Sequence, residues 1–132
     1  MSYDLFVFAP DGVPRDRAGF HEWFADRREA VEQMTPLPTP PGGPLGKFYE
    51  EMTCVFPDLN GPTGKGIEDV DILAGYEFQQ DHIYIDFRWS LAAEACNLAI
   101  DVARETGLGL FDLNSLLLFP EPLAGLGSQE NP

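Results

Sequence analysis

The residues most able to do chemistry in this chain are carboxylates on a stretch with the pattern of two β-strands. Between Gly66 and Phe87 the sequence reads GIEDVDILAGYEFQQDHIYIDF and contains no Lys or Arg. Closely placed carboxylates can share a proton, bind a cation or receive a basic group from another protein. The acidic residues of this stretch are Glu68, Asp69, Asp71, Glu77, Asp81 and Asp86.

Other catalytic chemistry has little support in the sequence. His21 belongs to an amphipathic helical pattern and His82 to a predicted hairpin turn, where exposure is usual. Neither histidine stands at a motif spacing from a Ser or Cys nucleophile, and the sequence has no zinc-type pair or phosphate-binding loop. We therefore predict no catalytic residue, no metal site and no cofactor. A carboxylate-dependent enzyme stays open as an alternative.

Composition limits the class of protein. A chain of 132 residues suits a single domain, 1–132, and 44% hydrophobic residues are enough for a packed core. The net charge of −14 repels nucleic acid and anionic lipid and speeds encounter with basic partners, although solubility alone is another explanation. Cys54 and Cys96 fall in apolar helical patterns, which predicts buried thiols in a reducing compartment.

The ends of the chain and its longest apolar runs bear on location. The beginning, MSYDLFVF, lacks the basic region and long apolar run of a signal peptide. No apolar stretch approaches membrane-spanning length. We expect a cytoplasmic protein without a membrane partner.

The elements that must position the carboxylates follow from hydrophobic periodicity and from turn residues. A strand at 3–9 precedes an amphipathic helix, the Pro-rich connection 36–44 and a second, shorter helix. A β-hairpin then leads to a helix that begins after Ser90 and stops at Gly107, and a strand at 108–113 follows. This order predicts an α+β fold of the ferredoxin-like, split βαβ type, with an antiparallel sheet and helices on one face. The tail from about 121 is predicted to be flexible.

The predicted hairpin brings two acidic residues together. A two-residue turn at Asp81 and His82 sets Glu77 directly opposite Asp86. Like charges opposed in this way are destabilising. Relief could come from Arg88 on the same strand, from a shared proton, or from a basic group of a partner protein.

The first strand extends the same surface. If Leu5 and Val7 face the helices, then Asp4, Phe6 and Phe8 face the open side of the sheet beside Tyr84 and Asp86. Two exposed phenylalanines are unfavourable unless something covers them. The candidates are the C-terminal tail, the Pro-rich connection, a partner protein or a second copy of the chain.

Four phrases also carry a family resemblance: SYDLFVFAP, FYEEM with FPDLNGP, DHIYIDFRWSLAAEACNLA, and GLGLFDLNS. Together they resemble a family of small, largely uncharacterised bacterial cytoplasmic proteins, some of which look like immunity proteins of polymorphic-toxin systems. The resemblance extends to about Ser115 and its motifs are structural, so it carries no catalytic residue. It implies a bacterial setting and an inhibitory role.

The sequence as a whole favours a binding protein: an acidic inhibitor, expected to be an immunity protein that neutralises a basic bacterial toxin. The alternative is a homo-oligomeric structural or small-ligand-binding domain, followed by the carboxylate-dependent enzyme. A basic protein is the expected partner, and no nucleic acid is expected to bind. The predicted contact residues are Glu68, Asp69, Asp71, Glu77, Asp81, Tyr84, Asp86, Arg88, Phe6 and Phe8.

Overall fold

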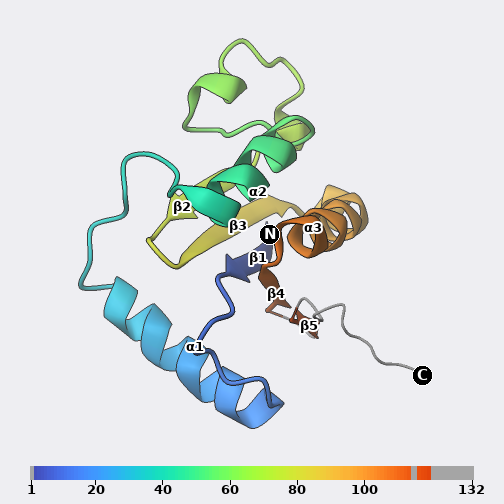
Figure 1. The fold of residues 1–132 in the computed structure, drawn as a ribbon. Coiled ribbons are helices and arrows are strands. Elements are labelled where there is room, and N and C mark those ends of the chain that lie inside the picture. Colours follow the sequence, from blue (N-terminus) through green and yellow to red (C-terminus); the bar gives the residue numbers. More distant parts are fainter. Residues whose placement is uncertain (1, 114–115, 120–132) are drawn as a thin grey trace.

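A computed structural model describes residues 2–113 and 116–119 of the chain (Figure 1). The predicted flexible tail from about 121 lies outside these residues. The short elements η1 to η3 are single turns of 3-10 helix. In chain order the elements are β1 (Ser2–Phe8), α1 (Arg17–Val31), α2 (Gly43–Thr53), η1 (Pro62–Gly64), η2 (Val70–Ile72), β2 (Gly75–Phe78), β3 (His82–Arg88), η3 (Trp89–Leu91), α3 (Ala92–Thr106), β4 (Gly109–Asp112) and β5 (Leu117–Leu118).

The strands form one antiparallel sheet in the order β2-β3-β1-β4-β5. The α+β class is therefore confirmed, and so is the pairing of the first strand with the strand after the hairpin turn. Two features depart from the predicted ferredoxin-like pattern. A fifth strand extends the sheet beyond β4, and the helices lie on both faces of the sheet instead of one.

Helices α2 and α3 cover one face of the sheet and make the larger core (Figure 1). Leu5, Val7 and Ile85 point from the strands into this core and have no exposed surface. Phe48 of α2 and Ala99 of α3 meet them from the helices and are equally buried. Alternation along β1 and β3 therefore sends every second side chain to this face, as the sequence predicts.

Helix α1 covers the opposite face, which the sequence analysis expected to be open (Figure 1). Phe6 and Phe8 have no exposed surface, because α1 lays Phe20 and Phe24 over them. The ring centroids of Phe24 and Phe6 are 4.9 Å apart, and those of Phe20 and Phe8 are 5.3 Å apart. Phe119 adds an edge contact to Phe8 at 5.4 Å. The prediction that helices occupy a single face is wrong, because β1 is apolar on both of its faces.

The helix ends follow local sequence rules with one exception. Asp16 caps α1 by accepting a hydrogen bond from the backbone N–H of Gly19 at 2.8 Å. Gly107 ends α3 in the left-handed conformation, at φ 74°, where glycine is favoured. The helix predicted to begin after Ser90 begins instead at Ala92, because Ser90 lies inside η3, and α3 has no side-chain cap.

Two further predictions about exposure are wrong. Cys54 is exposed and not buried, because α2 ends just before it; both it and the half-buried Cys96 are free thiols. His82 is fully buried and not exposed, because it is the first residue of β3 and faces α1. Within the described part of the chain, no helix is long and apolar enough to cross a membrane.

Candidate binding site

The hairpin between β2 and β3 has a different register from the predicted one. The turn is Gln80-Asp81, because the backbone N–H of Gln79 donates to the carbonyl of His82 at 2.9 Å. Glu77 therefore pairs with Tyr84. The predicted cross-strand pair of Glu77 and Asp86 is wrong. The register differs by two residues, so each side chain keeps its predicted face and changes only its partner.

A like-charge pair does occur, but it joins β1 to β3. Asp4 lies directly opposite Asp86, and both side chains point to the face that carries α1. Asp4 accepts hydrogen bonds from the Tyr84 hydroxyl at 2.7 Å and from the Ser2 hydroxyl at 2.8 Å. Asp86 makes no ion pair and no hydrogen bond to another side chain within residues 2–113 and 116–119. Of the two opposed carboxylates, Asp4 is held by hydroxyl donors, whereas Asp86 has neither a counter-ion nor a side-chain hydrogen bond among the described residues.

The surroundings of Asp86 act on its protonation. Water still reaches the side chain, but the walls around it remove part of its hydration, and this partial burial raises its pKa. The negative charge of Asp4 raises it further. Gly75, the partner of Asp86 on β2, leaves the necessary space, since a Cβ built at Gly75 would collide with the Asp86 carboxylate.

These residues line an open recess of about 380 Å³ at one end of the α1 face, which we call the acidic recess. Its charged groups are the carboxylates of Asp4, Glu77 and Asp86 and the guanidinium of Arg28. Tyr84 lies between them, and burial together with its hydrogen bond to Asp4 raises the pKa of its hydroxyl. The phenol therefore stays protonated and keeps donating to Asp4.

Two arginines of α1 form ion pairs with Glu77 and Asp81, two of the carboxylates predicted to contact a partner. Arg28 lies over the ring of Tyr84, with its guanidinium carbon 4.2 Å from the ring centroid, and reaches Glu77 at 3.8 Å. Arg27 forms a 2.8 Å ion pair with Asp81. The sequence had suggested Arg88 as the basic partner within the chain, but the ion pairs of Glu77 and Asp81 come from Arg28 and Arg27 instead. Since α1 lies on this face, its arginines reach the hairpin.

The remaining predicted contact residues lie elsewhere. Glu68, Asp69 and Asp71 are exposed on the loop before β2 and do not line the acidic recess, although η2 packs against β3 and η3. Asp69 accepts a hydrogen bond from the backbone N–H of Asp71 at 3.1 Å. Arg88 is exposed and forms no ion pair in the described part of the chain. It therefore does not neutralise Glu77 or Asp86, as the sequence had suggested it could.

Two predicted contact residues need correction, and two residues of the site were not predicted. Phe6 and Phe8 cannot be exposed anchors for a partner, because α1 buries them completely. Asp4 was not among the predicted contacts, yet it completes the acidic recess. Its signal was present in the sequence, because alternation along the first strand places it on the same face as Phe6. Arg28 was also missed, since its position depends on which face α1 covers.

The acidic recess has the chemistry of a site for an organic cation. Its carboxylates outnumber its single guanidinium, and Asp86 offers free acceptors for a charge-assisted hydrogen bond. A Lys or Arg side chain would meet these acceptors and would relieve the repulsion between Asp86 and Asp4. In the region that the structure describes, no group of three His, Cys, Asp or Glu side chains is placed to hold a metal ion.

Comparison of the chain with protein-family models, with curated proteins and with solved structures found no match.

Proposed function

We propose that this protein is an acidic binding protein that inhibits a basic protein, in the manner of an immunity protein that neutralises a bacterial toxin. The observation that carries the proposal is the direct pairing of Asp4 with Asp86 in an open recess, where Asp86 has no counter-ion among the described residues. A basic side chain of the partner would enter the acidic recess and bridge the two carboxylates.

The charge of the whole chain supports the same partner. A net charge of −14 attracts a basic protein over long distances and accelerates its association. Glu68, Asp69 and Asp71 add exposed charge outside the recess and contribute to this steering. The same field repels phosphate backbones, so we propose that no nucleic acid binds. We also propose that the protein is cytoplasmic, because an incoming toxin would be neutralised in that compartment.

The alternative of a homo-oligomer has lost its main support. It required the sheets of two copies to pair face to face and hide Phe6 and Phe8. Both side chains are already buried beneath α1 within one copy, so nothing apolar at these positions needs a second copy. The inhibitor therefore remains the function that the geometry supports best.

The test is co-expression with the product of the neighbouring gene, followed by measurement of association rate and affinity in purified form. We expect a stable complex whose association rate falls steeply as salt is added, because screening weakens steering. Asp86→Lys should cost about 2 kcal/mol or more of binding free energy, as expected for a central contact.

Asp101→Lys is the matched control. It makes the same change in net charge at an exposed position of α3, away from the recess. It should slow association slightly and leave the dissociation rate unchanged. Equal effects of the two variants would show that only bulk charge matters, and an association rate that salt does not affect would contradict the proposal altogether.

A further inference from the structure

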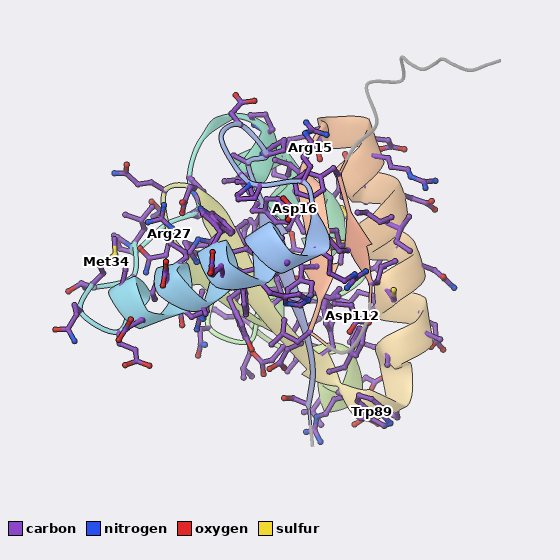
Figure 2. The ribbon with its side chains drawn as sticks, turned by 90° about the horizontal axis from the view of Figure 1, so that it is seen from below. Arg15, Asp16, Arg27, Met34, Trp89 and Asp112 are labelled. Atoms are coloured by element: carbon purple, nitrogen blue, oxygen red, sulfur yellow. The ribbon has the colours of Figure 1, made fainter. Side chains whose placement is uncertain are left out.

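Trp89 is a large apolar side chain that the fold leaves in water. It is 49% exposed, whereas tryptophan is highly buried on average in folded proteins. Alternation along β3 sends Ile85 and Phe87 into the larger core, and Trp89 would be the next residue in that series. The chain leaves the strand at Arg88 instead, and η3 carries the indole out to the surface. Figure 2 shows Trp89 where α3 begins, well away from Met34 beyond the end of α1.

The exposed ring of Trp89 is held in place from within. It meets the ring of Tyr3 edge to face, with the centroids 5.8 Å apart and the planes at 71°. Tyr3 is itself buried, and its hydroxyl donates a 2.6 Å hydrogen bond to Asp112. A side chain that is already ordered in the free protein loses little conformational entropy on binding. Trp89 is therefore suited to be a central contact for a partner, as tryptophan commonly is.

A second exposed apolar side chain belongs to the neighbouring turn. η2 lies against η3, and Val70 of η2 is 52% exposed. Single apolar side chains scattered over a surface are normal, but two on adjoining turns, one of them tryptophan, are typical of a contact surface. We call Trp89 and Val70 the apolar anchor.

The surface around the apolar anchor is acidic. Asp69 caps η2 and Asp71 lies within it, so both flank Val70, and both are exposed. Neither forms an ion pair with the residues that the structure describes. The exposed Arg88 is the only Lys or Arg between Gly66 and Leu91. An apolar centre edged by carboxylates complements a protein surface that carries a large apolar side chain between basic ones.

The acidic recess lies near the same end of the sheet. Asp86, which lines the recess, precedes Trp89 by three residues, or about 10 Å of extended chain. Ser2, another residue of the recess, pairs with Arg88. A partner surface of ordinary size therefore covers the acidic recess and the apolar anchor together.

We propose that Trp89 and Val70 anchor the basic partner: a large apolar side chain of the partner packs against them, while its basic neighbours pair with Asp69 and Asp71. This inference rests on the proposed function, since it takes the partner to be the same basic protein. It adds that the charges set the association rate, whereas the apolar anchor sets the dissociation rate.

A heptapeptide of alternating arginine and leucine tests the apolar anchor on the native chain. Labelling with 5-fluorotryptophan gives separate ¹⁹F resonances for Trp23 and Trp89, the two tryptophans of the chain. We expect the peptide to shift the Trp89 resonance in a saturable manner and to leave that of Trp23 unchanged. The same peptide with serine in place of leucine should bind about tenfold more weakly, because it has no apolar side chain to bury.

Three results of the peptide experiment would overturn the inference. The first is equal binding of the two peptides, and the second is a Trp89 resonance that does not shift. The third is a Trp89 resonance that shifts with protein concentration alone, because a second copy of the chain would then occupy the apolar anchor.

The complex with the product of the neighbouring gene supplies the second arm. Trp89→Ala should weaken it about tenfold or more through faster dissociation, with the association rate unchanged because no charge is lost. Met34→Ala is the matched control, since Met34 is 48% exposed and far from the apolar anchor. It should leave the affinity within about twofold of the native value. If Trp89→Ala does not fold, Val70→Ser takes its place.

The variants separate this inference from the proposed function. A complex that weakens with Asp86→Lys and not with Trp89→Ala would overturn the apolar anchor and leave the proposed function standing. A complex that weakens with Trp89→Ala but responds neither to Asp86→Lys nor to salt would contradict the proposed function and support the anchor. If no complex forms, the proposed function fails, and the comparison of the two peptides still decides the anchor.

Discussion

At the scale of single residues, the carboxylate of Asp86 is held between a charge and a glycine. Asp4 stands opposite it on β1, and Gly75 stands opposite it on β2. Charge repulsion raises the free energy of the ionised form, while the missing side chain at Gly75 leaves the carboxylate a place to lie. Asp86 therefore affects both the stability of the fold and the proposed binding, and a single substitution can test each effect.

Gly75→Ala tests the space that Asp86 needs. The new Cβ would collide with the Asp86 carboxylate, which is exposed and can turn aside, so we expect a loss of about 0.5–1 kcal/mol in the free energy of unfolding. Urea denaturation measures it. The matched background is Asp86→Ala, in which the collision partner is gone. There the same glycine change should cost much less, and an equal cost in both backgrounds would mean that the collision is not the cause.

The dependence of stability on pH should differ in sign between two carboxylates. The pKa of Asp86 is raised above 3.8 in the folded chain, so ionised Asp86 lowers stability, and this loss develops as pH rises from 3.8 through the folded pKa. Asp86→Asn removes the loss. We expect it to be more stable than the native chain at neutral pH, by a fraction of a kcal/mol because the side chain is exposed, with the gain vanishing at low pH.

Asp81→Asn is the control variant, because the Asp81 carboxylate changes stability with pH in the opposite direction. The pKa of Asp81 is lowered from 3.8 by His82 and Arg27, so its stabilisation is present above 3.8 and is lost as pH falls through the folded pKa. This variant should be less stable than the native chain at neutral pH, and the deficit should shrink in acid. Urea denaturation of both variants across pH checks the pair. Parallel curves would contradict it.

At the scale of secondary-structure elements, the decisive contact is that of α1 with the sheet. The sequence predicts α1, its apolar side chains and the strands, because each follows local periodicity. The sequence also indicates that both faces of the sheet are covered. β1 carries Leu5, Phe6, Val7 and Phe8 in succession, and such a continuous apolar run is typical of a strand buried on both faces. The interpretation of an open face gave this run too little weight.

The acidic recess was harder to predict than the fold. The side of the sheet on which each hairpin residue lies follows from alternation, and the structure confirms it for Glu77 and Asp86. The cross-strand partner depends instead on which two residues form the turn, and Gln80-Asp81 and Asp81-His82 are both chemically acceptable turns. The arginines that pair with Glu77 and Asp81 come from α1, so no local pattern in the hairpin could indicate them.

Phe20→Ala tests the docking of α1. The side chain is fully buried between the helix and the sheet, where its ring meets those of Phe8 and Phe111. Its removal should lower the free energy of unfolding by about 3–5 kcal/mol. Urea denaturation measures the loss. Glu22→Ala, an exposed change on the same helix, should stay within about 0.5 kcal/mol. Similar losses in both variants would show that the burial of Phe20 against the sheet is not the cause.

At the scale of the whole molecule, the net charge of −14 opposes compactness. Raising NaCl from about 0.01 M to about 0.15 M shortens the Debye length from about 30 Å to about 8 Å and weakens this repulsion. We expect the melting temperature to rise by a few degrees across this range. Sucrose at equal osmolality is the control. A melting temperature that does not change with salt would mean that repulsion from the net charge contributes little to stability.

The placement of the two tryptophans gives the molecule an optical sensor of its own. Trp23 lies on α1 against the rings of Phe6 and Phe8, whereas Trp89 is 49% exposed beside Tyr3, in η3. Detachment of α1 moves one indole into water and leaves the other where it is. In the variant Trp89→Phe, a red shift of emission would therefore follow the departure of a single helix, in real time and without any attached dye.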